Sequence, residues 1–140
     1  MSRTIRFATL FLLGSMAGCE PTAPESNLLG AAPHGGVSFV FPNKKGSVEI
    51  GVERKEGASK GPRLVTAYFY GPDGTTPLAT APTDVKIAQG SLPPIPLTQQ
   101  DLPGKEGRFA SAPGPYSDEI RGVLEATVEG EKVEVPFARR

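Results

Sequence analysis

The chain has 140 residues, and fifteen Lys and Arg balance fifteen Asp and Glu, so its formal net charge is zero. Without a basic stripe or an arginine cluster, a nucleic-acid-binding protein is excluded and no nucleic-acid partner is expected. The single cysteine excludes internal disulfides, thiolate zinc sites and iron–sulfur clusters, so stability must come from a packed core.

The first eighteen residues have the three parts of an export signal. Arg3 and Arg6 provide a basic start, residues 7–17 form an apolar run, and small residues precede Cys19. A helix of that length rises only roughly 17 Å, about half the hydrocarbon core of a bilayer. We therefore expect residues 1–18 to be a signal peptide that is removed on export.

The sequence Met16-Ala17-Gly18-Cys19 resembles the lipobox of bacterial lipoproteins, although Leu is commoner where Met16 stands. The resemblance implies that Cys19 is lipidated and that signal peptidase II cleaves between Gly18 and Cys19. Two or three acyl chains would make the anchor effectively permanent. Glu20, where Asp would imply inner-membrane retention, favours the outer membrane over another envelope membrane. The alternative is an ordinary cleaved signal followed by an unlipidated cysteine.

Residues 19–33 carry three prolines among small and polar residues, a composition typical of a tether. Such a tether could hold a domain roughly 30 to 40 Å from the bilayer. Leu28 and Leu29 can instead dock on the domain. We expect a lipidated tether over residues 19–33 and one folded domain over residues 34–140.

Short β-periodic segments begin after residue 36. Residues 37–41 and 48–52 alternate between apolar and polar or small side chains, which is typical of half-buried strands. Residues 64–70 are apolar on both faces and predict a central strand. The sequence GPDG at residues 71–74 predicts a turn.

Proline crowds the next two candidate strands, residues 85–87 and 95–97, which therefore suit sheet edges. Residues 108–110 predict a strand after a loop at residues 104–107.

The clearest hairpin closes the chain. Alternate apolar residues of 120–128 and 133–137 share one face, with a turn at residues 129–131. No window has a convincing helical period. About seven to nine short strands predict a single antiparallel β-sandwich of immunoglobulin-like architecture, with a small barrel as the alternative.

Several short motifs are similar to those of a group of small lipoproteins of planctomycete-type bacteria. They are the opening PHGG at residues 33–36, VEI at 48–50, TAY at 66–68 and the closing hairpin. In that group two further histidines often accompany the first, which implies metal handling. Here Ser47 and the turn at residues 71–74 stand in their places.

His34 is the only histidine and the candidate metal ligand. Transition-metal sites normally need three or four ligands, which Glu49 or Asp73 would have to complete. The competing interpretation is that Gly35 and Gly36 make a tight entry into the first strand while His34 binds a backbone carbonyl. We expect no cofactor.

The sequence patterns of common hydrolases and nucleotide-binding enzymes are missing, so we expect the protein not to be an enzyme. Tyr116, in a Pro-Gly-Pro-Tyr loop, is the candidate ligand contact, with a cap on the end of the sandwich as the alternative. At least one of Tyr68 and Tyr70 is expected in the core.

The sequence therefore predicts a lipid-anchored cell-envelope β-sandwich that acts as a non-enzymatic binding or accessory module. Its expected partners are the membrane, through Cys19, and another envelope protein. Two alternatives stay open. One is a periplasmic metal-handling protein that uses His34 with carboxylates. The other is a carbohydrate- or peptide-binding domain with a groove between Tyr116 and the loops at residues 71–74 and 104–107.

Overall fold

A computed structural model of the chain describes residues 28–29, 32–55 and 59–139. The predicted signal peptide, its cleavage site and Cys19 lie outside these residues. Within them the chain is built from strands and turns. No helix in the described part is long and apolar enough to span a membrane.

Ten β-strands follow one another along the described residues. They are β1 (Leu28–Leu29), β2 (Val37–Val40), β3 (Ser47–Arg54), β4 (Arg63–Tyr70), β5 (Thr83–Gln89), β6 (Leu92–Pro96), β7 (Thr98–Leu102), β8 (Lys105–Ala110), β9 (Ile120–Val128) and β10 (Glu131–Arg139).

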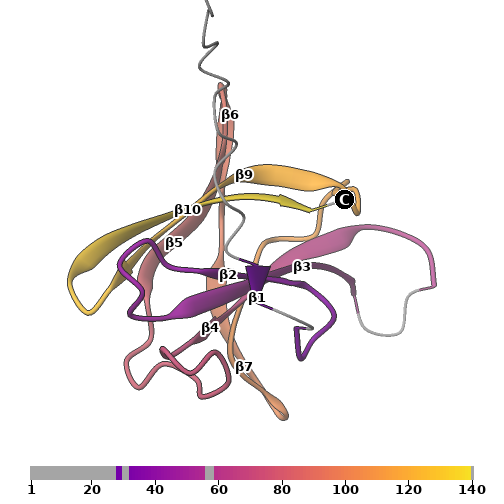
Figure 1. Cartoon of the computed structure of the whole chain (residues 1–140). Helices are drawn as coiled ribbons and strands as arrows, with labels where there is room; N and C mark the ends of the chain where they lie inside the picture. The colour runs from indigo at the N-terminus through magenta and orange to yellow at the C-terminus, as the bar shows by residue number, and fades with distance from the viewer. Residues whose placement is uncertain (1–27, 30–31, 56–58, 140) are drawn as a thin grey trace, which may run out of the picture.

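The strands form two antiparallel sheets that pack face to face. One sheet has the order β1-β2-β3-β4-β8-β7, and the other has the order β10-β9-β5-β6. Figure 1 shows the β9–β10 hairpin stacked over β2 and β3. The predicted antiparallel β-sandwich is therefore confirmed.

The core lies between the two sheets and consists of the apolar residues that alternate along each strand. Its buried members are Phe39, Phe41, Val48, Ile50, Val65, Ala67, Phe69, Val85, Ile87, Leu97, Phe109, Ile120, Leu124, Ala126, Val128, Val133, Val135 and Phe137. Because side chains on a strand point alternately to opposite faces, the same strands present a second set of residues on the outer faces.

The strongest sequence patterns predicted strands and turns that the structure contains. The strand predicted as central is β4, which lies between β3 and β8. The closing hairpin is β9–β10, whose turn residues Glu129 and Gly130 both have positive φ, as a two-residue hairpin turn requires. In the GPDG turn, Gly74 has a φ of 71° and its amide donates to the Gly71 carbonyl.

Two expectations about individual segments were wrong, and one strand was not predicted. The segment at residues 85–87 lies in β5, between β9 and β6, and not at an edge. Its nearest proline, Pro82, precedes the strand, so no ladder amide is lost. Strand β7 has a polar sequence, TQQDL, without apolar alternation, and was missed. The predicted loop at residues 104–107 is mostly the start of β8.

The first sheet also reaches into the segment predicted as a tether. Leu28 and Leu29 form β1, which pairs with Phe39 and Ser38 of β2. The folded part of the chain therefore begins before the predicted boundary at residue 34.

Candidate functional site

The outer face of the six-stranded sheet is polar and nevertheless buried. The strand register places Tyr68 beside Glu49 on one side and beside Arg108 on the other. Glu49 is 1% exposed and Arg108 is 4% exposed, while Tyr68 and Tyr70 are buried as well. Charged side chains are rarely buried without partners, so the contacts of these groups decide what the face can do.

Glu49 is the centre of a first group of contacts, which we call the histidine cluster (His34, Glu49, Tyr68 and Tyr70). Its Oε1 accepts hydrogen bonds from the backbone amides of His34, at 3.0 Å, and Gly36, at 2.8 Å. Its Oε2 accepts one from the Tyr70 hydroxyl at 3.2 Å. The carboxylate thereby ties the chain segment before β2 to the face of β3 and β4.

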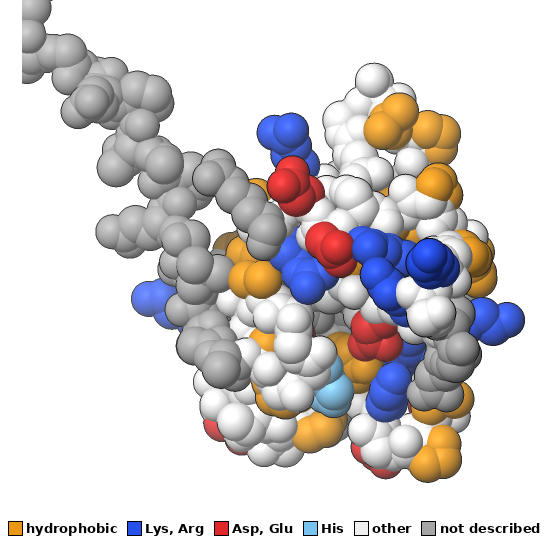
Figure 2. All heavy atoms as spheres, turned by 90° about the vertical axis from the view of Figure 1, so that its right-hand side faces the viewer, with side chains coloured by type: hydrophobic (Ala, Val, Ile, Leu, Met, Phe, Trp, Pro, Cys, Tyr) orange, Lys and Arg blue, Asp and Glu red, His pale blue; other side chains and the backbone are white. Residues whose placement is uncertain are grey.

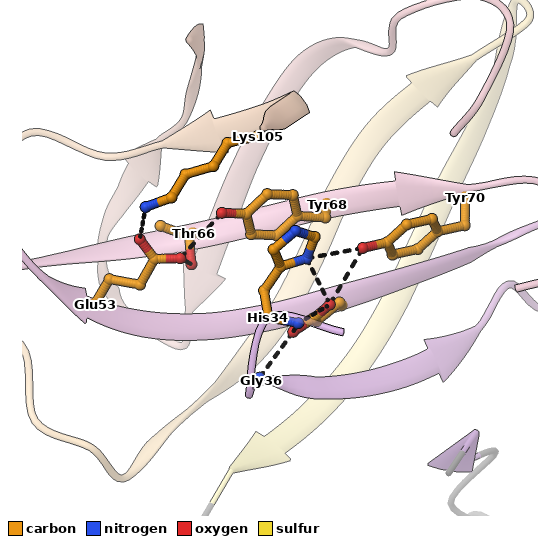
Figure 3. A network of polar contacts seen from close by, with 8 residues as sticks. His34, Gly36, Glu53, Thr66, Tyr68, Tyr70 and Lys105 are labelled. Atoms are coloured by element: carbon orange, nitrogen blue, oxygen red, sulfur yellow. Dashed lines mark hydrogen bonds and ion pairs between the residues drawn. The ribbon is translucent and has the colours of Figure 1, made fainter. Parts of the chain in front are cut away.

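The imidazole of His34 completes the cluster. Its Nδ1 lies 3.2 Å from Glu49 Oε2 and 3.0 Å from the Tyr70 hydroxyl oxygen. The ring also stacks on Tyr68, with centroids 3.8 Å apart and planes 5° from parallel. Figure 3 shows the His34 ring against Tyr68, with a dashed line from the imidazole to the Tyr70 hydroxyl group. The His34 side chain is 29% exposed, so one part of the cluster reaches the surface.

Glu53, four residues further along β3 and on the same face as Glu49, organises a second group of contacts. Its Oε1 accepts hydrogen bonds from Tyr68 at 3.1 Å and Thr66 at 3.3 Å. Its Oε2 lies 2.9 Å from Arg108 Nη2 and 3.6 Å from Lys105 Nζ. Burial raises the pKa of Glu53, but the two cations and the hydrogen bonds outweigh burial and lower the pKa overall.

Tyr68 and Tyr70 are held in their neutral form. Burial, the charge of Glu53 and the hydrogen bond to it raise the pKa of Tyr68 to about 12. Burial, followed by the charge of Glu49 and the bond to it, raises the pKa of Tyr70 further. Both phenols are therefore donors to carboxylates at neutral pH.

The two glycines after His34 fit the backbone to this face. Gly35 has a φ of 76°, which lets the chain turn toward β2. A Cβ on Gly36 would lie 2.6 Å from the carbonyl oxygen of Ile50 and 2.8 Å from Glu49 Cγ. The predicted tight entry into β2 is confirmed, and the close approach of Gly36 to the backbone of β3 at Ile50 and to the Glu49 side chain is what requires glycine.

We expect Gly36→Ala to lower the free energy of unfolding by about 1 to 3 kcal/mol, because the backbone of β3 cannot yield to the added methyl group. Urea unfolding followed by circular dichroism measures the change. The matched control is Gly71→Ala, whose Cβ would have ordinary contact distances, 3.6 Å or more. Equal stabilities of the two variants would contradict the close approach.

The structure places His34 beside Glu49, one of the two carboxylates expected near it, but not beside Asp73 or a backbone carbonyl. The ring binds a carboxylate and a phenol, not a backbone carbonyl. Asp73 accepts hydrogen bonds from the amides of Thr75 and Thr76 in its own turn and does not contact His34. Among the described residues, no group of three or more His, Cys, Asp and Glu side chains lies close enough to hold a metal ion.

Tyr116 and the two loops expected to form a groove with it are not gathered at one place. The ring of Tyr116 packs on the core and lies against Gly114, which bridges to Arg63 at the start of β4. The turn at residues 71–74 follows the other end of β4. The eight residues of β4 lie between Tyr116 and this turn, and a strand of that length spans roughly 25 Å.

Little in the sequence predicts this site. The alternation in β3 predicts that Glu49 and Glu53 face water, and Arg108 has no neighbouring motif. The available signal was the doubly apolar β4, since a strand with Tyr68 and Tyr70 on its second face must have that face covered.

Comparisons with protein-family models, curated proteins and solved structures found no match for this chain. The fold and the site therefore define its class only as a β-sandwich domain with a buried polar network on one outer face.

Proposed function

We propose that the chain is a lipid-anchored protein of the cell envelope, and that its β-sandwich acts there as a non-enzymatic binding or accessory module. The single observation that carries the anchor is Cys19, directly behind an apolar run and the small residues Ala17 and Gly18. By its resemblance to the lipobox, this order of residues makes Cys19 the attachment point in the outer or another envelope membrane.

Two contacts suit the domain to such a tether. Strand β1 adds Leu28 and Leu29 to the sheet edge, and the histidine cluster fixes the chain again at His34 and Gly36. A load on the anchor would have to break strand pairing and the bonds to Glu49 before it reached the core. This double attachment supports a domain that is held at a membrane through its amino-terminal side.

The chemistry of the polar groups supports a binding role rather than catalysis. Glu49 accepts bonds from two amides and a phenol, and Glu53 is paired with Arg108 and Lys105. A general base needs a free lone pair within reach of a substrate proton. Because these carboxylates are already engaged, the cluster is better suited to holding the surface in shape. The proposed partners are the membrane and another envelope protein.

Lipid labelling tests the anchor. The full chain should be expressed in a bacterial host with an alkynyl fatty acid, and mass spectrometry should then find a mature protein that starts at Cys19 and carries acyl chains. Cys19→Ser should abolish the label and release the protein from membranes. Ser15→Ala, which changes the leader outside the lipobox, is the matched control and should keep both. A bare thiol at Cys19, or an uncleaved leader in the wild-type protein, would refute the anchor.

A further inference from the structure

A hollow of about 500 Å³ lies on the outer face of the six-stranded sheet, beside the network of Glu53. This volume is within the range of small-molecule sites, roughly 300 to 1,000 Å³. We call it the arginine hollow. It is lined by Lys55, Leu64, Pro96, Thr98, Gln100, Leu102, Arg108, Ser111, Ala112 and Pro113.

The apolar side chains that line the hollow are not part of the core between the two sheets. Leu64 and Leu102 come from β4 and from the end of β7, and Pro96 and Pro113 add to the apolar wall. Leu102 is 37% exposed and is one of two large apolar side chains that are exposed among the described residues. Leu64 is buried, whereas Pro96, Leu102 and Pro113 are exposed, and exposed apolar groups that line one hollow favour a ligand with an apolar part.

The charged part of the lining favours an anion. The Nη1 of Arg108 donates to Gln100 Oε1 at 2.6 Å, and its Nη2 pairs with Glu53. Its buried Nε has no hydrogen-bond partner in the described structure. Because this Nε is itself enclosed by protein, what Arg108 contributes to the hollow is the positive charge of its guanidinium group.

Lys55 adds the charge that is not compensated. It lines the hollow, is exposed, and takes part in no ion pair with another described residue. Of the residues that line the hollow only Lys55 and Arg108 are charged, and both are cations, while the nearby Glu53 is shared between Arg108 and Lys105. The hollow therefore favours an anion. Figure 2 shows Lys and Arg side chains gathered around a few acidic ones on the face that also carries the histidine.

We propose that the arginine hollow binds an amphiphilic monocarboxylate, whose acidic group lies at Lys55 and Arg108 and whose aliphatic chain lies against Leu64 and Leu102. The proposal names a ligand class for the binding module proposed above and rests on that role. It does not rest on the lipid anchor, so the two can fail separately.

Octanoate, below the concentration at which it forms micelles, is the probe. The full chain with Cys19→Ser should be used, so that no acyl chain on Cys19 competes for the hollow. Isothermal titration should show saturable binding of octanoate, and acetate and 1-octanol should each bind at least about tenfold more weakly, because each lacks one half of the recognised chemistry.

Single substitutions locate the binding. We expect Lys55→Gln to weaken octanoate binding about tenfold and Leu102→Ser about fivefold. The matched controls are Lys60→Gln, in the same β3–β4 connection, and Leu92→Ser, the other exposed leucine at 63%; neither lines the hollow. Both controls should bind as the parent does. These exposed positions avoid Arg108, whose loss would leave Glu53 without its main partner.

Failure of octanoate to bind would overturn the proposal, and so would equal binding by the Lys55, Leu102 and control variants. A result in which 1-octanol binds as well as octanoate would also overturn it, because the cations would then have no role. None of these results would affect lipid labelling of Cys19, which tests the anchor alone.

Discussion

Glu49→Ala is expected to lower the free energy of unfolding by about 3 to 5 kcal/mol, the largest effect among the polar substitutions considered. The substitution removes the acceptor of the His34 and Gly36 amides and of the Tyr70 hydroxyl. These donors are buried or partly buried, and water cannot replace the carboxylate without opening the cluster. Urea unfolding followed by tyrosine fluorescence and by circular dichroism measures the loss.

The matched control is Glu134→Ala, which removes the same carboxylate from an exposed position. Comparison with Glu49→Ala therefore shows how much of the loss of stability comes from burial. The Glu134 carboxylate pairs with Lys132 on the outer face of β10, and the Glu134 side chain is 55% exposed. Since exposed ion pairs contribute little, Glu134→Ala should change stability by less than about 1 kcal/mol. If Glu49→Ala cost no more than this control, Glu49 would not be the residue that holds the segment before β2.

The inner face of the sandwich could be predicted from the sequence because alternation reports burial on one side of a strand. The alternation of Leu124, Ala126 and Val128 predicted the hairpin correctly, and residues 64–70 predicted the central strand. These patterns involve residues only two positions apart, so they can be recognised within a short stretch of sequence.

The candidate site could not be predicted, because its members come from separate strands and their burial comes from one another. Glu49 and Tyr70 are 21 residues apart, and Glu53 and Arg108 are 55 apart. The alternation that predicts Glu49 to face water is correct about its direction. The alternation cannot show that the segment at His34 and Gly36, which precedes β2, covers that face and binds Glu49. The polar strand β7 was missed for a related reason, since it is held at the sheet edge by pairing with β8.

Alkaline pH should destabilise the fold through the buried phenols. An unfolded tyrosine has a pKa near ~10, whereas the pKa of Tyr68 is about 12 in the folded chain and that of Tyr70 is also raised. Below pH ~10 both states keep these protons. Above it only the unfolded state releases them, so the free energy of unfolding falls by about 1.4 kcal/mol per pH unit for each tyrosine.

For Tyr68 this fall ends at its folded pKa of about 12, which gives a loss of roughly 2 to 3 kcal/mol across the window. Urea unfolding at intervals between pH ~9 and pH ~11.5 measures the slope, and the ultraviolet absorbance of tyrosinate follows ionisation in the folded state.

The variant Tyr68→Phe separates the phenol from the lysines that titrate in the same range. It loses the hydrogen bond to Glu53, so its stability at neutral pH should be lower than that of the parent. Above pH ~10 the free energy of unfolding of the variant should fall less steeply than that of the parent, by about 1.4 kcal/mol per pH unit. The reason is that phenylalanine has no proton to release in the unfolded state. Parallel slopes for the variant and the parent would mean that Tyr68 ionises equally in both states. The hydrogen bond to Glu53 would then fail to protect the phenol, and the polar network on this face would be open to water.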